Sequence, residues 1–191
     1  MIKKNNVISF SEYKLGKIEG LTFFADLKSK ESFFGRSKEN YKSEFGFERK
    51  INDFFDIYIG YYDKGKFNGN GLLNTESFIY LGNFLNDRMT GNCEIIFNKK
   101  AKYTGNVLDG HLDGLGTYYF EDKSYFKGNF KNNLACGKGV IYYPNGDIFE
   151  GVFLNNSKNG ECLYKSLGDK NIFSGFYDNG QEIIEKSIFK Y

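Results

Sequence analysis

Two Gly-x-Gly pairs, at residues 114 and 116 and at residues 137 and 139, have a spacing that could cradle a phosphate group. Dinucleotide fingerprints and P-loops, however, need a strand, then a glycine loop, then a helix whose N-terminus faces the phosphate. Each pair here leads into an apolar run, at 118–120 and 141–143, which is typical of a strand. We therefore expect no nucleotide site and no cofactor.

The other residue types that carry chemistry are few and scattered. His111, the single histidine, has no cysteine or serine set around it that would suit catalysis or metal binding. The three cysteines, Cys93, Cys136 and Cys162, form neither a CxxC pair nor a zinc spacing, so we expect reduced thiols. The sequence predicts no catalytic residue, no metal site and no enzymatic activity.

Composition narrows the protein class. The chain has 191 residues with a formal net charge of +2, which gives weak support for nucleic-acid binding, and we expect no nucleic-acid partner. Aromatic residues make up 19% of the chain, far more than disordered segments contain. No apolar run approaches the ~20 residues that cross a bilayer, and no lipid anchor signal is present. These features favour a soluble, cytoplasmic protein, with association to cytoskeleton or membrane left open.

A repeat organises the chain. The tripeptide aromatic-x-Gly recurs with its glycine at positions 60, 82, 105, 128, 151 and 175. A further glycine follows nine residues after each of the first five, at positions 69, 91, 114, 137 and 160. A small residue stands two positions later, at Gly71, Cys93, Gly116, Gly139 and Cys162. A period of about 23 residues with several locked offsets indicates a repeat array.

This pattern resembles the MORN repeat (membrane occupation and recognition nexus). The resemblance covers about residues 57 to 180, as five clear units and a partial sixth. Residues 1–56 read as degenerate repeats or a cap, because FFG at 33–35 and Gly46 keep part of the pattern. Residues 181–191 form a tail whose Ile184 and Ile188 suit a short helical cap. A frayed terminus is the alternative for this tail.

The expected fold is all-β, an elongated single-layer antiparallel meander of β-hairpins. Alternation along a strand places Tyr58, Gly60 and Tyr62 on one face. We call the glycine of each aromatic-x-Gly tripeptide the lead glycine. Five residues after each lead glycine the sequence has Gly, Asn or Asp, at positions 65, 87, 110, 133, 156 and 180. These residue types tolerate the positive φ that tight hairpin turns require. We expect the opposite face to be mostly polar in the middle units and apolar at the ends, where the N-terminal segment and the tail would cover it.

The resemblance implies a non-catalytic scaffold or adaptor in a cytoskeletal, flagellar or membrane-associated assembly. Exposed aromatic rings would supply a groove for partner proteins. The candidate groove residues are Tyr58, Tyr62, Tyr80, Phe84, Tyr103, Phe126, Phe130, Phe149 and Phe153. The alternative is that most of these rings pack on one another as the core. Free sheet edges also make a homodimer possible.

The second hypothesis is a peripheral membrane protein that binds anionic phospholipid head groups, including phosphoinositides. The candidate lipid contacts are Lys99, Lys100, Lys102, Lys123, Lys127 and Lys131. Each lysine near an anionic surface contributes roughly 1 kcal/mol. Nearby Asp109, Glu121 and Asp122 dilute this charge, so a solvated mixed-charge surface is the competing interpretation.

Overall fold

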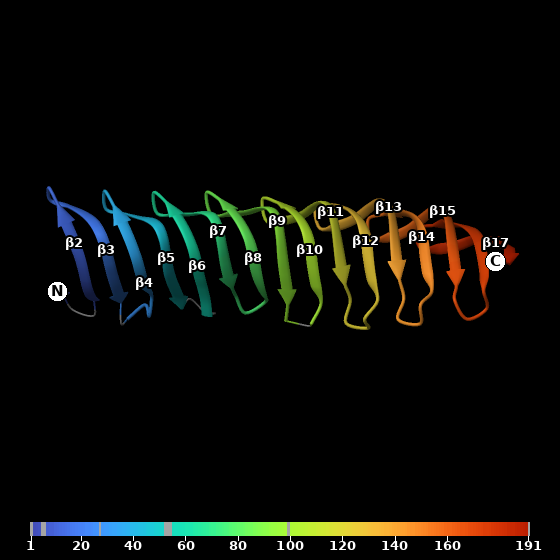
Figure 1. Cartoon of the computed structure of the whole chain (residues 1–191), viewed down its shortest axis with the longest axis horizontal. Helices are drawn as coiled ribbons and strands as arrows, with labels where there is room; N and C mark the ends of the chain where they lie inside the picture. Colours follow the sequence, from blue (N-terminus) through green and yellow to red (C-terminus); the bar gives the residue numbers. More distant parts are fainter. Residues whose placement is uncertain (1, 5–6, 27, 52–54, 99, 191) are drawn as a thin grey trace. The chain divides into compact units, whose positions relative to one another are not determined.

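The computed structural model describes residues 2–4, 7–26, 28–51, 55–98 and 100–190. The chain divides into two compact units, Met1–Asn98 and Lys99–Tyr191. Within each unit, successive strands lie side by side and antiparallel in one layer (Figure 1). The predicted all-β, single-layer antiparallel meander is therefore confirmed within each unit.

The first unit contains β1(Ile2–Lys4), β2(Val7–Lys14), β3(Lys17–Asp26), β4(Ser32–Lys38), β5(Tyr41–Ile51), β6(Phe55–Asp63), β7(Lys66–Asn74), β8(Phe78–Leu85) and β9(Arg88–Phe97). The second unit contains β10(Lys102–Leu108), β11(His111–Tyr119), β12(Tyr125–Lys131), β13(Leu134–Tyr142), β14(Ile148–Leu154), β15(Ser157–Ser166), β16(Asn171–Asp178) and β17(Gln181–Lys190).

Two-residue turns close the hairpins, and both central residues have positive φ, as the tightest hairpin turns require. In the β8–β9 turn, Asn86 has φ 50° and Asp87 has φ 69°. In the β14–β15 turn, Asn155 has φ 50° and Asn156 has φ 71°. The six turn positions predicted from the sequence all have positive φ, at Gly65, Asp87, Gly110, Asn133, Asn156 and Gly180.

In the hairpins of the five clear repeat units, a β-bulge follows the lead glycine. The bulge determines the role of the glycine that stands nine residues after the lead glycine. Between Gly128 and Asn129 the register with β13 shifts, and Gly137 lies on the longer return strand with φ 68°. A Cβ added at Gly137 would meet nothing within 4 Å. This glycine therefore does not make room for an aromatic ring, and its role is the backbone conformation of the bulge.

The tail does not form the predicted helical cap. Residues Gln181–Lys190 form β17, which pairs with β16 from Asp178↔Gln181 to Asn171↔Lys190. Strand β16 would otherwise present an unpaired backbone edge, and the tail satisfies it with main-chain hydrogen bonds. The tail therefore extends the sheet edge and does not cover the open side of Phe176, which is 38% exposed.

Residues before the clear repeats build the same kind of hairpin. Strands β4 and β5 pair as Gly35↔Gly46, and β5 continues directly into pairing with β6 as Gly46↔Gly60. Phe33 is buried, and its ring occupies the space above Gly35 and Gly46. Strands β4 and β5 therefore extend the same sheet edge to edge with β6. They do not cover the exposed side chains of β6, although the sequence led us to expect this of the N-terminal segment.

The core consists of aromatic rings that lie flat over glycines of their own and the neighbouring strand. A Cβ added at Gly139 would lie 2.4 Å from the Phe126 ring, and one at Gly128 would lie equally close. The first aromatic residue of each aromatic-x-Gly tripeptide is the lead ring. The lead rings Tyr58, Phe126 and Phe149 each meet, edge to face, a second ring on their own strand and one on the next hairpin. Phe126 does so with Phe130 at 5.3 Å and with Phe153 at 4.8 Å between ring centroids. Such pairs stabilise by ~1 kcal/mol beyond their buried area.

Three lead tyrosines add a hydrogen bond to this packing. The hydroxyls of Tyr58, Tyr80 and Tyr103 donate to the carbonyl oxygens of Tyr61, Asn83 and Asn106, at 2.9, 2.7 and 2.8 Å. Each acceptor follows a lead glycine, where the bulge disrupts the ladder of main-chain bonds. The tyrosine hydroxyl thus satisfies a polar group inside the core.

Asn and Asp at the turns also fasten each hairpin to the preceding one. The side-chain oxygen of Asn156 accepts from the backbone N–H of Ala135 at 2.6 Å, and the Asn156 N–H donates to the Ala135 carbonyl at 3.0 Å. Asn133 makes the same pair of bonds with Leu112, and Asp87 makes it with Phe67. The sequence indicated the turn conformation of these residues but not this second role.

We predict that Asn156→Gly lowers the free energy of unfolding by about 1 kcal/mol more than Asn155→Gly does, because only the Asn156 side chain bonds Ala135. Both substitutions keep positive φ and add the same flexibility to the unfolded chain. Urea denaturation followed by circular dichroism measures the difference. Equal losses for the two variants would show that the side-chain bond contributes nothing.

Candidate protein-binding surface

The nine aromatic residues predicted to line a partner groove are not on the surface. Each has at most 5% of its area exposed, and Tyr80 and Tyr103 have none. Their rings fill the core above the glycines, so a partner cannot reach them without unfolding a hairpin. The competing interpretation of these rings, as the core of the sheet, describes what the structure shows. The surface that a partner can reach is the opposite face, which we call the open face.

The open face of the first unit carries a row of apolar side chains that runs across neighbouring strands. Strand register places each member directly beside the next. We call this the apolar row; its members are Phe10, Phe23, Phe34, Phe47, Ile59, Leu72 and Leu81. It spans β2 to β8, about 29 Å at the usual strand spacing. Its next neighbour on β9 is Glu94, which ends it.

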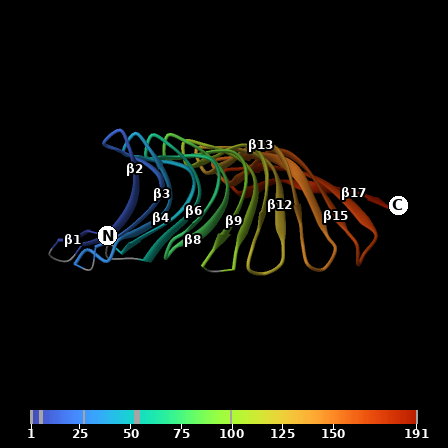
Figure 2. The ribbon, with the colours of Figure 1, turned by 60° about the vertical axis from the view of Figure 1, so that its left-hand side comes forward.

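Further apolar side chains widen this surface. Phe45 and Tyr61 lie beside the row with their rings 5.4 Å apart, and they are 54% and 50% exposed. Leu21, Ile79 and Ile96 are exposed on the same face. Scattered exposed apolar residues are ordinary, but a contiguous set of this extent marks an interaction surface. Figure 2 shows that the strands of this unit are bent along their length.

The corresponding open face of the second unit has a different chemistry. A row in the same register there consists of Thr117, Lys127, Val140, Glu150, Leu163 and Ser174. This face is hollowed into a trough of about 1000 Å³ that extends from Leu115 on β11 to Phe176 on β16. Charged and apolar side chains alternate in it, in contrast to the apolar row.

The lysines predicted to contact lipid do not gather at one place. Lys131 ends β12 and pairs with Asp113 at 2.9 Å. Lys123 lies in the turn before β12, so the length of that strand, about 20 Å, separates the two. Lys127 belongs to the open face between them, Lys102 is the first residue of β10, and Lys100 precedes that strand. Lys99 is outside the described residues.

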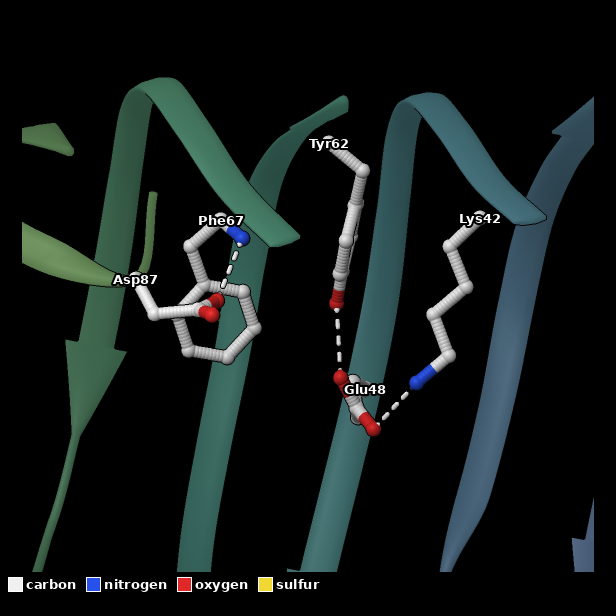
Figure 3. A network of polar contacts seen from close by, with 5 residues as sticks. All are labelled: Lys42, Glu48, Tyr62, Phe67 and Asp87. Carbon is white, nitrogen blue, oxygen red and sulfur yellow. Dashed lines mark hydrogen bonds and ion pairs between the residues drawn. The ribbon is translucent and has the colours of Figure 1, made fainter. Parts of the chain in front are cut away.

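One polar cluster lies inside the core of the first unit (Figure 3). The Lys42 ammonium donates to the Glu48 carboxylate, which also accepts from the Tyr62 hydroxyl at 3.1 Å. The ammonium lies 4.9 Å from the centroid of the Phe33 ring, a cation–π distance. Burial, and then the charge of Glu48, raise the pKa of Tyr62, so its hydroxyl remains a donor. Glu48 is 7% exposed, so the core encloses its carboxylate, whereas the Lys42 side chain remains partly exposed.

Within the described residues, no group of three His, Cys, Asp or Glu side chains is placed to hold a metal ion. His111 is exposed, and its Nδ1 lies 3.1 Å from the backbone oxygen of Asp109. All three cysteines are free thiols, and Cys93 and Cys162 pair with the lead glycines of the neighbouring strands. No helix of the described chain is long and apolar enough to cross a bilayer.

We predict that Cys93 reacts slowly with iodoacetamide in the folded protein. Burial raises the pKa of its thiol from an ordinary value of 9.0 to about 11, which leaves about a hundredfold less of the reactive thiolate at pH 8. Alkylation of a Cys136→Ser, Cys162→Ala variant, followed by mass spectrometry, measures the rate. The rate should rise about a hundredfold in urea, and in the folded protein it should keep rising above pH 9. A folded rate equal to the unfolded rate would contradict the burial of this thiol.

Comparison with known proteins agrees with this geometry. The MORN repeat model matches residues 58–73, 103–125 and 126–148, each of which includes a lead aromatic and glycines of the core. No curated protein matches the sequence. Repeats of this family suggest a repeat protein that takes part in binding. Each matched segment contains a lead ring, its lead glycine and the return strand of the same hairpin, so these three segments carry the MORN repeat.

Proposed function

We propose that this protein is a non-catalytic scaffold that binds a partner protein through the open face of its first unit. The observation that carries the proposal is the apolar row, which contains no charged residue, together with Phe45 and Tyr61 beside it. These two flanking side chains are 54% and 50% exposed. Aromatic and aliphatic side chains held rigidly on a sheet bind partners at low entropic cost. The row therefore supplies the aromatic surface that the repeats implied, on the face opposite the core.

The size of this surface suits a specific protein interface. Three lines of side chains along each strand occupy about 17 Å, and with the 29 Å length they cover roughly 500 Å² of sheet. Side-chain relief increases that area, which brings it toward the ~800 Å² that each partner contributes to a stable interface. An assembly on cytoskeletal or membrane-associated structures is consistent with such a scaffold and is part of the proposal.

The test compares two variants as bait in affinity capture from native cells. Phe34→Ser/Phe45→Ser/Tyr61→Ser removes three exposed rings of the open face, and Leu15→Ser/Leu85→Ser/Leu154→Ser removes exposed apolar residues near hairpin turns. We expect the first variant to lose the partners that wild type captures and the second to keep them. Capture of the same partners by both would overturn the proposal. Co-sedimentation with anionic vesicles but with no protein would favour the phospholipid alternative.

A further inference from the structure

The open face of the second unit combines charge and apolar surface in an ordered way. Lys127 on β12 and Lys138 on β13 are exposed at one side of the trough, and Glu150 on β14 and Glu161 on β15 at the other. In the described part of the chain, none of these four side chains forms an ion pair. The two lysines lie on adjacent strands and the two glutamates on the next two strands, each strand about 4.8 Å from its neighbour. The trough is thus basic along one part of its length and acidic along the next.

Apolar side chains lie between these charges. Val140 lies between Lys127 and Glu150 in register, and Val152 pairs with Lys138. Phe176 pairs with Glu161 and is 38% exposed. A ligand that fills the trough must therefore bury an apolar stripe and present charges of both signs at its margins, in a fixed order.

The backbone beneath the trough restricts the conformation of that ligand. The strands under it are paired on both sides, from β11 with β12 to β15 with β16, so they offer no free main-chain partners. An extended peptide laid across them would leave its own N–H and C=O groups buried and unpaired. A helix satisfies those groups internally. The distance from β11 to β16 is about 24 Å, the length of about 16 helical residues.

We propose that the trough of the second unit binds an amphipathic helix of a partner protein whose charged flank is acidic in one half and basic in the other. The acidic half lies on β12 and β13, and the basic half lies on β14 and β15. This fixes the direction of the helix along the unit. The site shares no residue with the apolar row, so it stands whether or not the proposed function of the first unit is correct.

The probe is a fluorescein-labelled 16-residue peptide with an apolar stripe of Leu and Ala, Glu along one half of its flank and Lys along the other. Fluorescence anisotropy with the full chain measures the dissociation constant. We expect Lys127→Glu/Lys138→Glu to weaken binding at least tenfold, because two attractions become repulsions. Adding Glu150→Lys and Glu161→Lys to that variant should restore binding, since the peptide can then lie in the reverse direction.

Three controls make the result decisive. A peptide of the same composition with interleaved Glu and Lys should bind about tenfold more weakly, and a peptide with a central proline should not bind. The Phe34→Ser/Phe45→Ser/Tyr61→Ser variant should bind the probe as wild type does. The inference is wrong if wild type does not bind the polarised peptide, if the four-residue swap fails to restore binding, or if the proline peptide binds equally well.

Discussion

Replacing Lys42 with methionine should destabilise the first unit by about 3–5 kcal/mol, a large part of the stability of a domain of this size. The substitution keeps the length of the side chain but removes the cation that neutralises Glu48. That carboxylate is 7% exposed, and it would remain charged inside the aromatic core without the Lys42 cation. The loss therefore comes from a buried carboxylate that no longer has the Lys42 ammonium beside it.

The same reasoning predicts that removing the entire cluster costs little. In the other hairpins, the positions equivalent to Lys42 include Phe67, Met89 and Leu112, and those equivalent to Glu48 include Leu73 and Ile95. The triple variant Lys42→Met/Glu48→Leu/Tyr62→Phe should be as stable as wild type or up to about 4 kcal/mol more stable. Urea denaturation of the full chain measures both variants. A triple variant no more stable than Lys42→Met alone would refute this explanation.

The second large effect is expected at Gly139. An alanine Cβ at this position would lie 2.4 Å from the Phe126 ring, whereas the nearest backbone atom is 3.3 Å away. The ring must leave its place over the strand, and with it goes most of the contribution of Phe126, about 3–5 kcal/mol. Gly168→Ala is the matched control, because a Cβ there would meet nothing within 4 Å.

A double-mutant cycle separates this cause from a general intolerance of alanine in β13. In a Phe126→Ala background the ring is absent, so Gly139→Ala should cost less than about 0.5 kcal/mol. The two losses are then far from additive, and thermal or urea unfolding reports the difference. If Gly139→Ala lowers the free energy of unfolding equally in both backgrounds, the Phe126 ring is not the reason that position 139 requires glycine.

Periodicity made most of the fold predictable. The turn at Asn132 and Asn133 and the pairing of Gly128 with Gly139 follow from offsets that recur in the sequence. These features depend on local backbone conformation and on alternation along a strand, which a single repeat already encodes.

The binding surface was less predictable for a physical reason. Alternation divides a strand into two faces but does not state which face is the core, and rings occur on both faces of β4 and β6. Phe33 and Tyr58 lie on the core face, whereas Phe34 and Tyr61 lie on the open face. The sequence signal for the core face was the glycine two residues after the buried ring. A glycine has no side chain, so the ring that precedes it can lie flat against the strand.

Other features depended on pairings that no short window reveals. Glu48 has a cation beside it in the core because Lys42, on the other side of the bulge in β5, reaches its carboxylate. The tail around Ile184 and Ile188 has a helical spacing, yet it forms β17 because the adjacent strand edge offers hydrogen bonds. Tertiary context overrides local propensity in both cases.

Hydroxyl-radical footprinting of the purified full chain, read by mass spectrometry, tests most directly which face of the sheet is available to partners. The rings of Phe34, Phe45 and Tyr61 should be oxidised at least tenfold faster than those of Tyr58, Tyr80 and Phe84, whose exposed area is at most 3%. Rapid oxidation of the second group with protection of the first would place the core on the other face. It would contradict both the packing described above and the binding surface that we propose.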